Sequence, residues 1–265
     1  MMRPPIATAA GRTWVLLRGL TRDSRHWGRF VGELQAAFPQ DRIVALDFAG
    51  NGARYAERSA IRVADMVEQA RAGLSHKGVR QPVYLLALSL GAMVAVEWAS
   101  RHREEVAAMV LLNTSLRPYS TFFQRLRPAS YGPILARMAL PATPLDWEQT
   151  ILRLTSNRPD RAILPQWAAW RAACPVRRSN ALRQLLAAAR YRAPPGPLPV
   201  PTLVLASARD RLVSAECSRT LARHGRADCV LHDWAGHDLP LDDGPWVVRQ
   251  TARWLAEKAG SSEAI

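Results

Sequence analysis

The sequence has few cysteines, few acidic residues and no long apolar run. Its cysteines are odd in number and lack the close pairs of zinc or redox motifs. We therefore expect a reducing compartment, no metal and no cofactor, and we interpret the three as packing residues: Cys174, Cys217 and Cys229. No segment approaches the roughly 18 apolar residues of a membrane span, and residues 1–12 lack a signal-peptide core. The sequence predicts a cytoplasmic protein without a membrane span.

The shortage of acidic residues is concentrated in one part of the chain. The 36 basic and 22 acidic residues give a formal net charge of +14. Residues 116–195 hold 13 arginines and 3 acidic residues, a local net charge of +10, leaving 23 basic and 19 acidic residues elsewhere. Two interpretations of this positive surplus stay open. It either binds an anionic partner, such as an acidic acyl carrier, an acyl-CoA or a substrate with a carboxylate, or it is simply a solvated face. No nucleic-acid-binding pattern accompanies it, so nucleic acid is not an expected partner.

Six short runs rich in Val, Leu and Ile predict strands that are buried on both faces of a sheet. Segments with helical periodicity lie between most of them, so we expect an α/β fold with a mainly parallel, doubly wound sheet. The predicted strands are Trp14–Arg18, Arg42–Asp47, Val83–Leu88, Ala107–Asn113, Thr202–Ser207 and Cys229–Trp234. The predicted helices are Trp27–Ala37, Ala60–Leu74, Ala92–Arg101, Ser214–Arg223 and Trp246–Lys258.

The alternation of strands and helices is interrupted once. Nothing in residues 116–197 has the pattern of a strand, and helices separated by proline-containing joints are predicted there, at Trp147–Leu154, Pro165–Ala173 and Asn180–Tyr191. We therefore expect residues 1–115 and 198–265 to form the core. Residues 116–197 are expected to be an inserted helical cap, or lid, over the carboxyl edge of the sheet.

The most specific motif surrounds Ser89. Residues 83–99 have the pattern of a buried strand, a turn with Ala87 and Gly91 as small residues on either side of the serine, and a helix. A nucleophile elbow needs this arrangement, because its strained turn brings strand and helix close together. The helix N-terminus and the N–H of Leu90 would then stabilise an oxyanion. The alternative is that Ser89 only caps the helix.

Asp210 and His237 are the candidate acid and base. Each follows a predicted strand, so both are expected at the carboxyl edge of the sheet, where α/β active sites form. Gly236 permits a tight turn that would bring the imidazole towards Ser89, and the order serine, acid, histidine is that of one known arrangement of the triad. Asp210 could instead cap a helix near Ser214.

Other polar residues near these strand ends are less suitable. Asn113 occupies an alternative acid position, but an amide cannot supply the negative charge that stabilises an imidazolium. Asp238, Asp242 and Asp243 lie close to His237 in sequence. We interpret these three as loop or helix-cap residues.

These motifs resemble the α/β-hydrolase superfamily across nearly the full chain, particularly small bacterial carboxylesterase-like members with a helical cap. The likeness includes Leu-Leu-Arg-Gly-Leu-Thr-Arg at residues 16–22 and Ala-Leu-Ser-Leu-Gly at residues 87–91. The resemblance implies the α/β-hydrolase fold, and it implies that the amide of Leu20 is a second oxyanion donor beside that of Leu90.

The resemblance also draws attention to three further residues and one exclusion. Where the superfamily has a His-Gly pair this chain has Arg18-Gly19, so Arg18 either hydrogen-bonds the loop or faces the pocket and binds a substrate carboxylate. His26 and Trp27 either line the pocket or pack at a helix start. Asp47 begins an Asp-x-x-Gly-x-Gly turn and is kept out of the triad.

The expected activity is that of a serine hydrolase, which cleaves a small-molecule carboxylic ester or thioester through an acyl-enzyme. An acyltransferase, or a thioesterase acting on an acyl carrier or CoA, would use the same residues. A catalytically silent protein that binds an apolar ligand is the alternative from another class. Epoxide hydrolases and haloalkane dehalogenases have a carboxylate at the elbow, so Ser89 argues against both.

Overall fold

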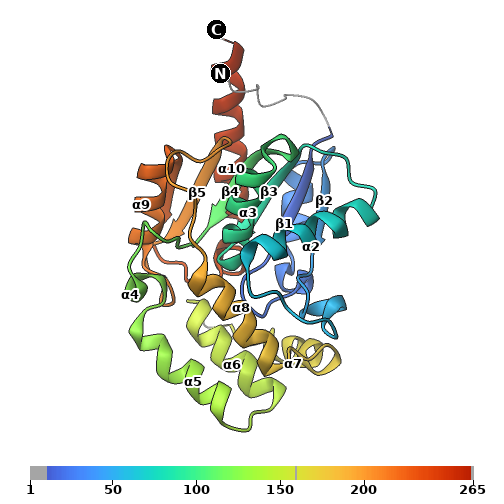
Figure 1. The fold of residues 1–265 in the computed structure, drawn as a ribbon, viewed down its shortest axis with the longest axis vertical. Coiled ribbons are helices and arrows are strands. Elements are labelled where there is room, and N and C mark those ends of the chain that lie inside the picture. The colour runs from blue at the N-terminus through green and yellow to red at the C-terminus, as the bar shows by residue number, and fades with distance from the viewer. Residues whose placement is uncertain (1–10, 159, 264–265) are drawn as a thin grey trace.

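The computed structural model describes residues 11–158 and 160–263. The strands of this part of the chain form one parallel sheet in the order β2-β1-β3-β4-β5-β6 (Figure 1). They are β1 (Thr13–Leu17), β2 (Arg42–Leu46), β3 (Val83–Leu88), β4 (Val106–Leu112), β5 (Thr202–Ser207) and β6 (Asp228–His232). The predicted parallel α/β sheet is confirmed. The prediction that no signal peptide is present concerns residues 1–12, of which 1–10 lie outside the described residues.

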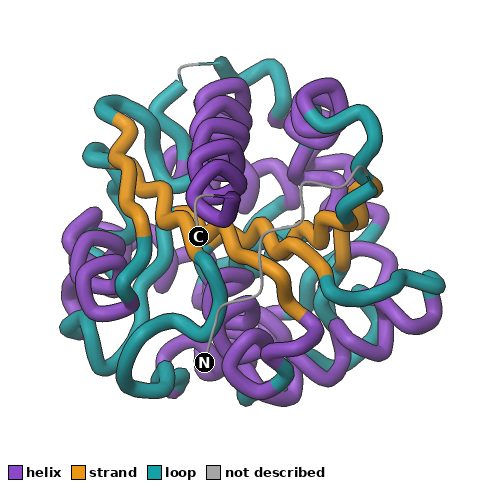
Figure 2. The backbone as a smooth tube through the Cα atoms, turned by 90° about the horizontal axis from the view of Figure 1, so that it is seen from above, coloured by secondary structure: helices purple, strands orange, loops and turns teal. Residues whose placement is uncertain are grey.

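Helices cover both faces of the sheet, as Figure 2 shows. One face packs against α1 (Phe30–Ala37) and α10 (Leu239–Glu263), and the other against α2 (Val63–His76), α3 (Leu90–Arg101) and α9 (Ala215–Gly225). All six residues of β3 are buried, which explains why the sequence of this strand is continuously apolar rather than alternating. No helix in the described part of the chain combines the length and apolarity needed to cross a membrane.

The first helix begins later than its apolar pattern predicted. Asp23 caps a separate 3₁₀ turn, Ser24–Trp27, and this turn ends at Gly28 with a φ of +51°. A residue in this conformation cannot continue a helix, because its φ has the opposite sign to that of a right-handed turn. Helix α1 therefore starts at Phe30 rather than at Trp27.

The region between β4 and β5 is helical over much of its length. The helices there are α4 (Phe122–Arg125), α5 (Tyr131–Ala139), α6 (Pro144–Thr155), α7 (Leu164–Ala173) and α8 (Arg178–Arg190). Figure 1 shows α5 to α8 gathered beyond one end of the sheet. The three helices predicted here are present, whereas α4 and α5 were not predicted. The division into a core and a separate cap stays a prediction.

A close contact between backbones joins α3 to the end of β1. A Cβ atom built on Gly91 would lie 2.3 Å from the carbonyl oxygen of Leu17 and 2.7 Å from that of Arg18. Both distances are far shorter than a normal van der Waals contact. Glycine at position 91 therefore allows α3 to start directly beside the loop that follows β1.

We expect Gly91→Ala to lower the free energy of unfolding by about 1–3 kcal/mol, because the backbone must move to admit the methyl group. Gly73→Ala in α2 is the matched control, since its added Cβ would have no neighbouring atom within 4 Å. The control should be neutral or more stable by up to about 1 kcal/mol. Chemical denaturation measures both variants, and equal stabilities would contradict the close contact.

Candidate active site

Ser89 joins β3 to α3 through a strained turn. Its φ is +57° and its ψ is −114°, a region that non-glycine residues rarely occupy. Hydrogen bonds to the end of β4 hold this turn in place. The Ser89 amide donates to the carbonyl of Leu112 at 3.0 Å, and the Thr114 hydroxyl donates to the Ser89 carbonyl at 3.2 Å. The Ser89 side chain makes no capping hydrogen bond to α3. A helix cap does not account for this serine.

Asp210 and His237 meet at the carboxyl edge of the sheet. Nδ1 of His237 lies 2.7 Å from Oδ2 of Asp210, and both side chains are buried. The other carboxylate oxygen accepts the amides of Leu212 at 2.7 Å and Val213 at 2.9 Å. Helix α9 has its own cap in Ser214. The tight turn after β5 therefore fixes the carboxylate in an orientation that faces the imidazole.

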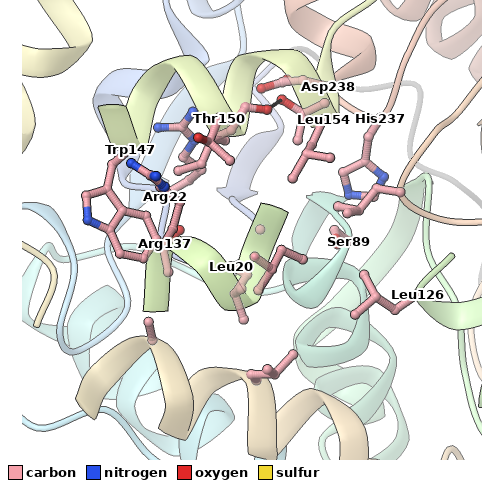
Figure 3. A pocket seen from close by; sticks show the side chains of 18 of the residues that line it. Leu20, Arg22, Ser89, Leu126, Arg137, Trp147, Thr150, Leu154, His237 and Asp238 are labelled. Atoms are coloured by element: carbon pink, nitrogen blue, oxygen red, sulfur yellow. Dashed lines mark hydrogen bonds between the residues drawn. The ribbon is translucent and has the colours of Figure 1, made fainter. Parts of the chain in front are cut away.

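Ser89 and His237 line the same cavity, which has a volume of about 150 Å³. Figure 3 shows the two side chains on one side of the cavity and Trp147 on the opposite side. Apolar side chains from α5, α6 and α8 form much of the remaining wall, including Ile134, Met138, Ile151, Leu154, Leu182 and Leu185. The structure thus brings together the three residues that the sequence predicted as nucleophile, acid and base.

Leu20 and Leu90 flank the elbow. Leu20 lines the main cavity, and both leucines line a second cavity of about 120 Å³ that also reaches Ser89. A Cβ atom on Gly19 would lie 3.2 Å from that of Ser89, so the loop after β1 passes directly beside the serine. Leu90 is the first residue of α3, and its amide therefore lies outside the hydrogen-bond ladder of the helix.

Helix α8 supports the loop that contains Leu20. The amide of Thr21 donates to Oε1 of Gln184 at 2.9 Å, and Nε2 of Gln184 donates to Oδ1 of Asn51 at 2.8 Å. The Asn51 amide group in turn donates to the carbonyl of Arg22 at 2.9 Å. The sequence analysis did not identify this chain of contacts, because no local pattern indicates a glutamine whose partners are 125 to 163 residues away.

Asn113 fixes the loop that carries His237. Its Nδ2 donates to the carbonyls of Gly236 at 3.1 Å and His237 at 2.9 Å, and also to the hydroxyl of Ser207. Its Oδ1 accepts the amide of Ser207 at 2.8 Å. The sequence analysis excluded Asn113 as the acid, and the structure gives it the role of a positioning residue that joins β4, β5 and the histidine loop.

Arg18 forms a buried ion pair with Asp238. Its Nη1 and Nη2 donate to the two carboxylate oxygens at 3.1 and 2.6 Å, and the guanidinium lies 4.8 Å from the ring centre of Trp27. Burial, the largest single effect, would raise the pKa of Asp238, but the charge and hydrogen bonds of Arg18, together with the charges of Arg22 and His237, outweigh it and hold this pKa below its usual value. These contacts fit the interpretation that Arg18 hydrogen-bonds within the protein rather than binds a substrate carboxylate, because Asp238 already balances its charge.

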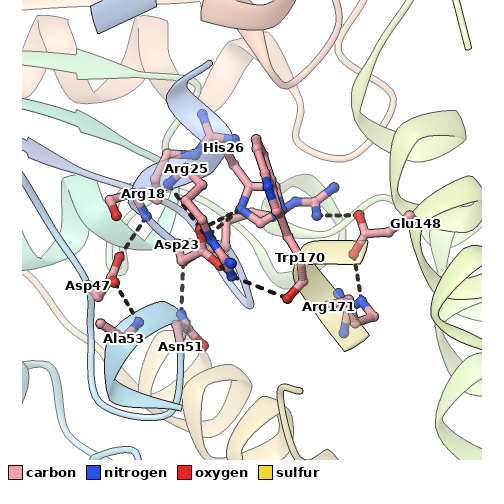
Figure 4. Close-up of polar contacts among 12 residues, drawn as sticks. Arg18, Asp23, Arg25, His26, Asp47, Asn51, Ala53, Glu148, Trp170 and Arg171 are labelled. Atoms are coloured by element: carbon pink, nitrogen blue, oxygen red, sulfur yellow. Dashed lines mark hydrogen bonds and ion pairs between the residues drawn. The ribbon is translucent and has the colours of Figure 1, made fainter. Parts of the chain in front are cut away.

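His26 and Trp27 pack inside the protein, and neither is among the residues that line the cavity. Nδ1 of His26 lies 3.1 Å from Oδ1 of Asp23, and Figure 4 shows His26 between Asp23 and Trp170. The imidazole makes edge contacts with Trp167 and Trp170. The packing alternative fits these contacts. Their suggested role in substrate binding receives no support from the position of either side chain.

Asp47 shapes a turn beside the site. Its carboxylate accepts the amides of Ser24 at 2.6 Å and Ala53 at 2.9 Å (Figure 4). Gly50 and Gly52 have φ values of +91° and +53°, which glycine adopts without strain. Asp47 therefore lies in the predicted structural turn, and its exclusion from the triad stays a prediction.

One group of side chains in the described residues has the composition of a metal site. Ligand atoms of His102, Glu104 and Glu105 lie within 4.8 Å of one another at the end of α3. Glu105 is already hydrogen-bonded to Arg71 and Trp98. None of the three lines the cavity at Ser89, so this group is not part of the candidate active site.

Comparisons with known proteins agree with this fold. Residues 14–250 match the model of a family described as the alpha/beta hydrolase family. A bacterial membrane phospholipase A has a TM-score of 0.76 and 22% identity, covering 94% of this chain and 79% of its own. A thermophilic esterase from Thermogutta terrifontis has a TM-score of 0.73 and 20% identity, with 95% and 92% covered. At such identities the likeness shows the fold alone.

A curated protein gives a shorter match. The homoserine O-acetyltransferase of Trichlorobacter lovleyi is 41% identical over 58 residues. This match covers 22% of the present chain and 16% of that protein. It therefore describes a local similarity and not a relationship over the whole length of either protein.

The buried His26 predicts a dependence of stability on pH. Burial lowers its pKa to about 4, whereas the pKa of an unfolded histidine is about 6.5. Between these values the unfolded chain binds a proton that the folded protein does not, so stability is lost as the pH falls. We expect His26 to account for a loss on the order of 3 kcal/mol from pH 6.5 to pH 4.

Urea denaturation across this pH range tests the assignment. His26→Gln should reduce the slope of stability against pH, because the group that takes up the proton on unfolding is gone. His76→Gln, which changes an exposed histidine, is the matched control and should keep the slope of the unmodified protein. The same slope in both variants would show that His26 is not the group responsible.

Proposed function

The chain belongs to the alpha/beta hydrolase family of hydrolases, and we propose that it is a serine hydrolase that cleaves a carboxylic ester or thioester. One observation carries the proposal. Ser89, in its strained turn, opens on the same apolar cavity as His237, whose imidazole is hydrogen-bonded to the buried Asp210. A nucleophile, a base and an acid in this relation are what acyl transfer requires.

In the proposed mechanism the carboxylate of Asp210 accepts a hydrogen bond from Nδ1–H of His237, so that the proton stays on Nδ1 and Nε2 is the free base. His237 takes the hydroxyl proton of Ser89 as the serine oxygen attacks the carbonyl carbon. The amides of Leu20 and Leu90 stabilise the oxyanion of the tetrahedral intermediate. His237 then gives its proton to the leaving alcohol or thiol. In the second half of the reaction His237 takes a proton from water as the water attacks the acyl-enzyme, and it returns this proton to Ser89 as the acid is released.

We further propose that α5, α6 and α8 act as a cap that shapes the substrate cavity. Their apolar side chains would bind the hydrocarbon part of the substrate, because each buried CH₂ contributes about 0.8 kcal/mol. The end of α6 is held beside the base, since the amide of Asp238 donates to the carbonyl of Thr155 at 2.7 Å and the amide of Asn157 donates to Asp242 at 2.9 Å. This support would keep the cavity wall in a fixed position relative to His237.

Acyl transfer to a second substrate is the other candidate function, favoured by the local match to a homoserine O-acetyltransferase. The two functions differ only in the acceptor that attacks the acyl-enzyme. Product analysis with acetyl-CoA separates them. Free acetate formed at the same rate with and without homoserine would support hydrolysis, and O-acetylhomoserine as the main product would support transfer.

Substitution of the proposed triad gives the direct test. We expect Ser89→Ala and Asp210→Asn each to lower kcat for 4-nitrophenyl esters by about 10³-fold or more. Ser120→Ala removes another buried serine, one that lines neither cavity at Ser89, and should keep activity within about three-fold.

A fluorophosphonate probe checks the same assignment without a chosen substrate. It should label the unmodified protein and Ser120→Ala but not Ser89→Ala. A folded protein that reacts at no serine would instead favour the alternative of a silent ligand-binding protein. Labelling at a residue other than Ser89 would exclude the proposed nucleophile.

The arginine surplus of residues 116–195 motivates a proposal about partners, namely that an acidic acyl carrier or acyl-CoA delivers the acyl group. Salt screens such attraction, since the Debye length falls from about 30 Å at 0.01 M to about 3 Å at 1 M. We expect kcat/KM for an acyl-CoA to fall by about three-fold or more over this range. The value for a neutral 4-nitrophenyl ester is the control, and an equal salt dependence of both substrates would exclude electrostatic steering.

A further inference from the structure

Arg22, a buried residue in the wall of the main cavity, has a terminal guanidinium nitrogen without a hydrogen-bond partner among the described residues. Arg22 lines this cavity, and its side chain is only 5% exposed. Its Nη1 donates to Glu148, whereas Nη2 has no hydrogen-bond partner in the described part of the chain. Figure 3 shows Arg22 beside Trp147, across the cavity from Ser89. A charged donor therefore lies at the end of the cavity farther from the serine.

The charges around Arg22 do not balance. Glu148 is buried and also accepts a hydrogen bond from Nε of Arg171 at 2.5 Å, so one carboxylate serves two guanidinium groups (Figure 4). For the next buried cation, Arg18, both terminal nitrogens are bound by the two carboxylate oxygens of Asp238, and only its Nε has no partner in the described residues. The group formed by Arg22, Glu148 and Arg171 thus has a net charge of +1 next to an apolar cavity.

The position of the Arg22 guanidinium is fixed. It lies 4.3 Å from the ring centre of Trp167, and the Arg22 carbonyl is held by the side chain of Asn51. Burial lowers the pKa of Arg22, and the opposing effect of Glu148 does not restore it. A buried charge with an unpaired donor is unfavourable unless a partner arrives, and the cavity that Arg22 lines offers a ligand a route to it.

We propose that Arg22 determines substrate specificity by binding a carboxylate at the far end of the substrate part that fills the cavity. This inference rests on the proposed function and narrows its substrate class to esters or thioesters whose apolar chain ends in a carboxylate. A carboxylate fits because it is a monoanion that neutralises the net charge of +1, and because guanidinium and carboxylate form strong charge-assisted hydrogen bonds. A phosphate dianion would leave an excess negative charge in an apolar wall.

The test measures binding rather than turnover, so that its failure is distinct from failure of the proposed hydrolysis. Calorimetry compares hexanoate with hexan-1-ol, which has the same carbon chain and no charge. We expect the unmodified protein to bind hexanoate about ten-fold more tightly or better. Equal affinities would overturn the proposal without the need for any variant, while leaving Ser89 labelling and ester cleavage unaffected.

Three variants then locate the carboxylate. Arg22→Met should weaken hexanoate binding by about ten-fold and change hexan-1-ol binding by less than about three-fold. Arg137→Met is the matched control, because Arg137 also lines the cavity and is only half-buried; it should change both affinities by less than about three-fold. Arg22→Lys, which keeps a positive charge in the wall, should recover part of the preference.

Two results with these variants would contradict the proposal, and a third would support it. If Arg137→Met removes the preference for hexanoate and Arg22→Met does not, the binding cation is Arg137. If neither variant changes the preference, the carboxylate binds at another place, such as the oxyanion donors beside Ser89. Loss of the preference in Arg22→Met but retention in Arg22→Lys would identify the charge at position 22 as the cause.

Discussion

The contact between Gly91 and the end of β1 is the constraint on which the rest of the site depends. Because α3 starts against the carbonyl oxygens of Leu17 and Arg18, the chain has no room for a relaxed connection from β3, and Ser89 takes a φ of +57°. The same contact brings the loop after β1 beside the serine. One close approach of two backbones therefore accounts both for the strained serine that lines the cavity and for the neighbouring loop of the proposed oxyanion site.

The loops around Ser89 are held by side chains that replace the hydrogen-bond ladder where the strands end. Asn113 joins β5 to the loop of His237, and Gln184 joins α8 to the loop of Leu20. Backbone groups at strand ends lose their ladder partners and need others when they are buried. The side-chain amides of Asn113 and Gln184 supply these missing hydrogen-bond partners. They also fix the distances between the loops whose residues must act together, so that the site is preorganised.

The sequence predicted the parts of the site that depend on local pattern. Ser89 and His237 each lie within a few residues of an apolar strand, so topology alone places them at one edge of the sheet. The contacts that hold them were not predictable, because Arg18 and its partner Asp238 are separated by 220 residues and any of several carboxylates could have filled that role. Helix α4 was missed because four residues are too few to show a period, and α5 was missed because a proline lies in its first turn.

The structure also changes the meaning of the arginine surplus. Arg125 donates to the carbonyls of Ala188 and Ala189, Arg127 to that of Asp210, and Arg183 to that of Ser59. Such arginines join the helices between β4 and β5 to each other and to the site, because a guanidinium has five donors and reaches several carbonyls that no ladder satisfies. Part of the positive charge in this segment is therefore a consequence of structural hydrogen bonding. Neutral carbonyls do not cancel the charge of a guanidinium, so these arginines still contribute to the field that an anionic partner would experience. Their number alone is therefore not evidence that such a partner exists.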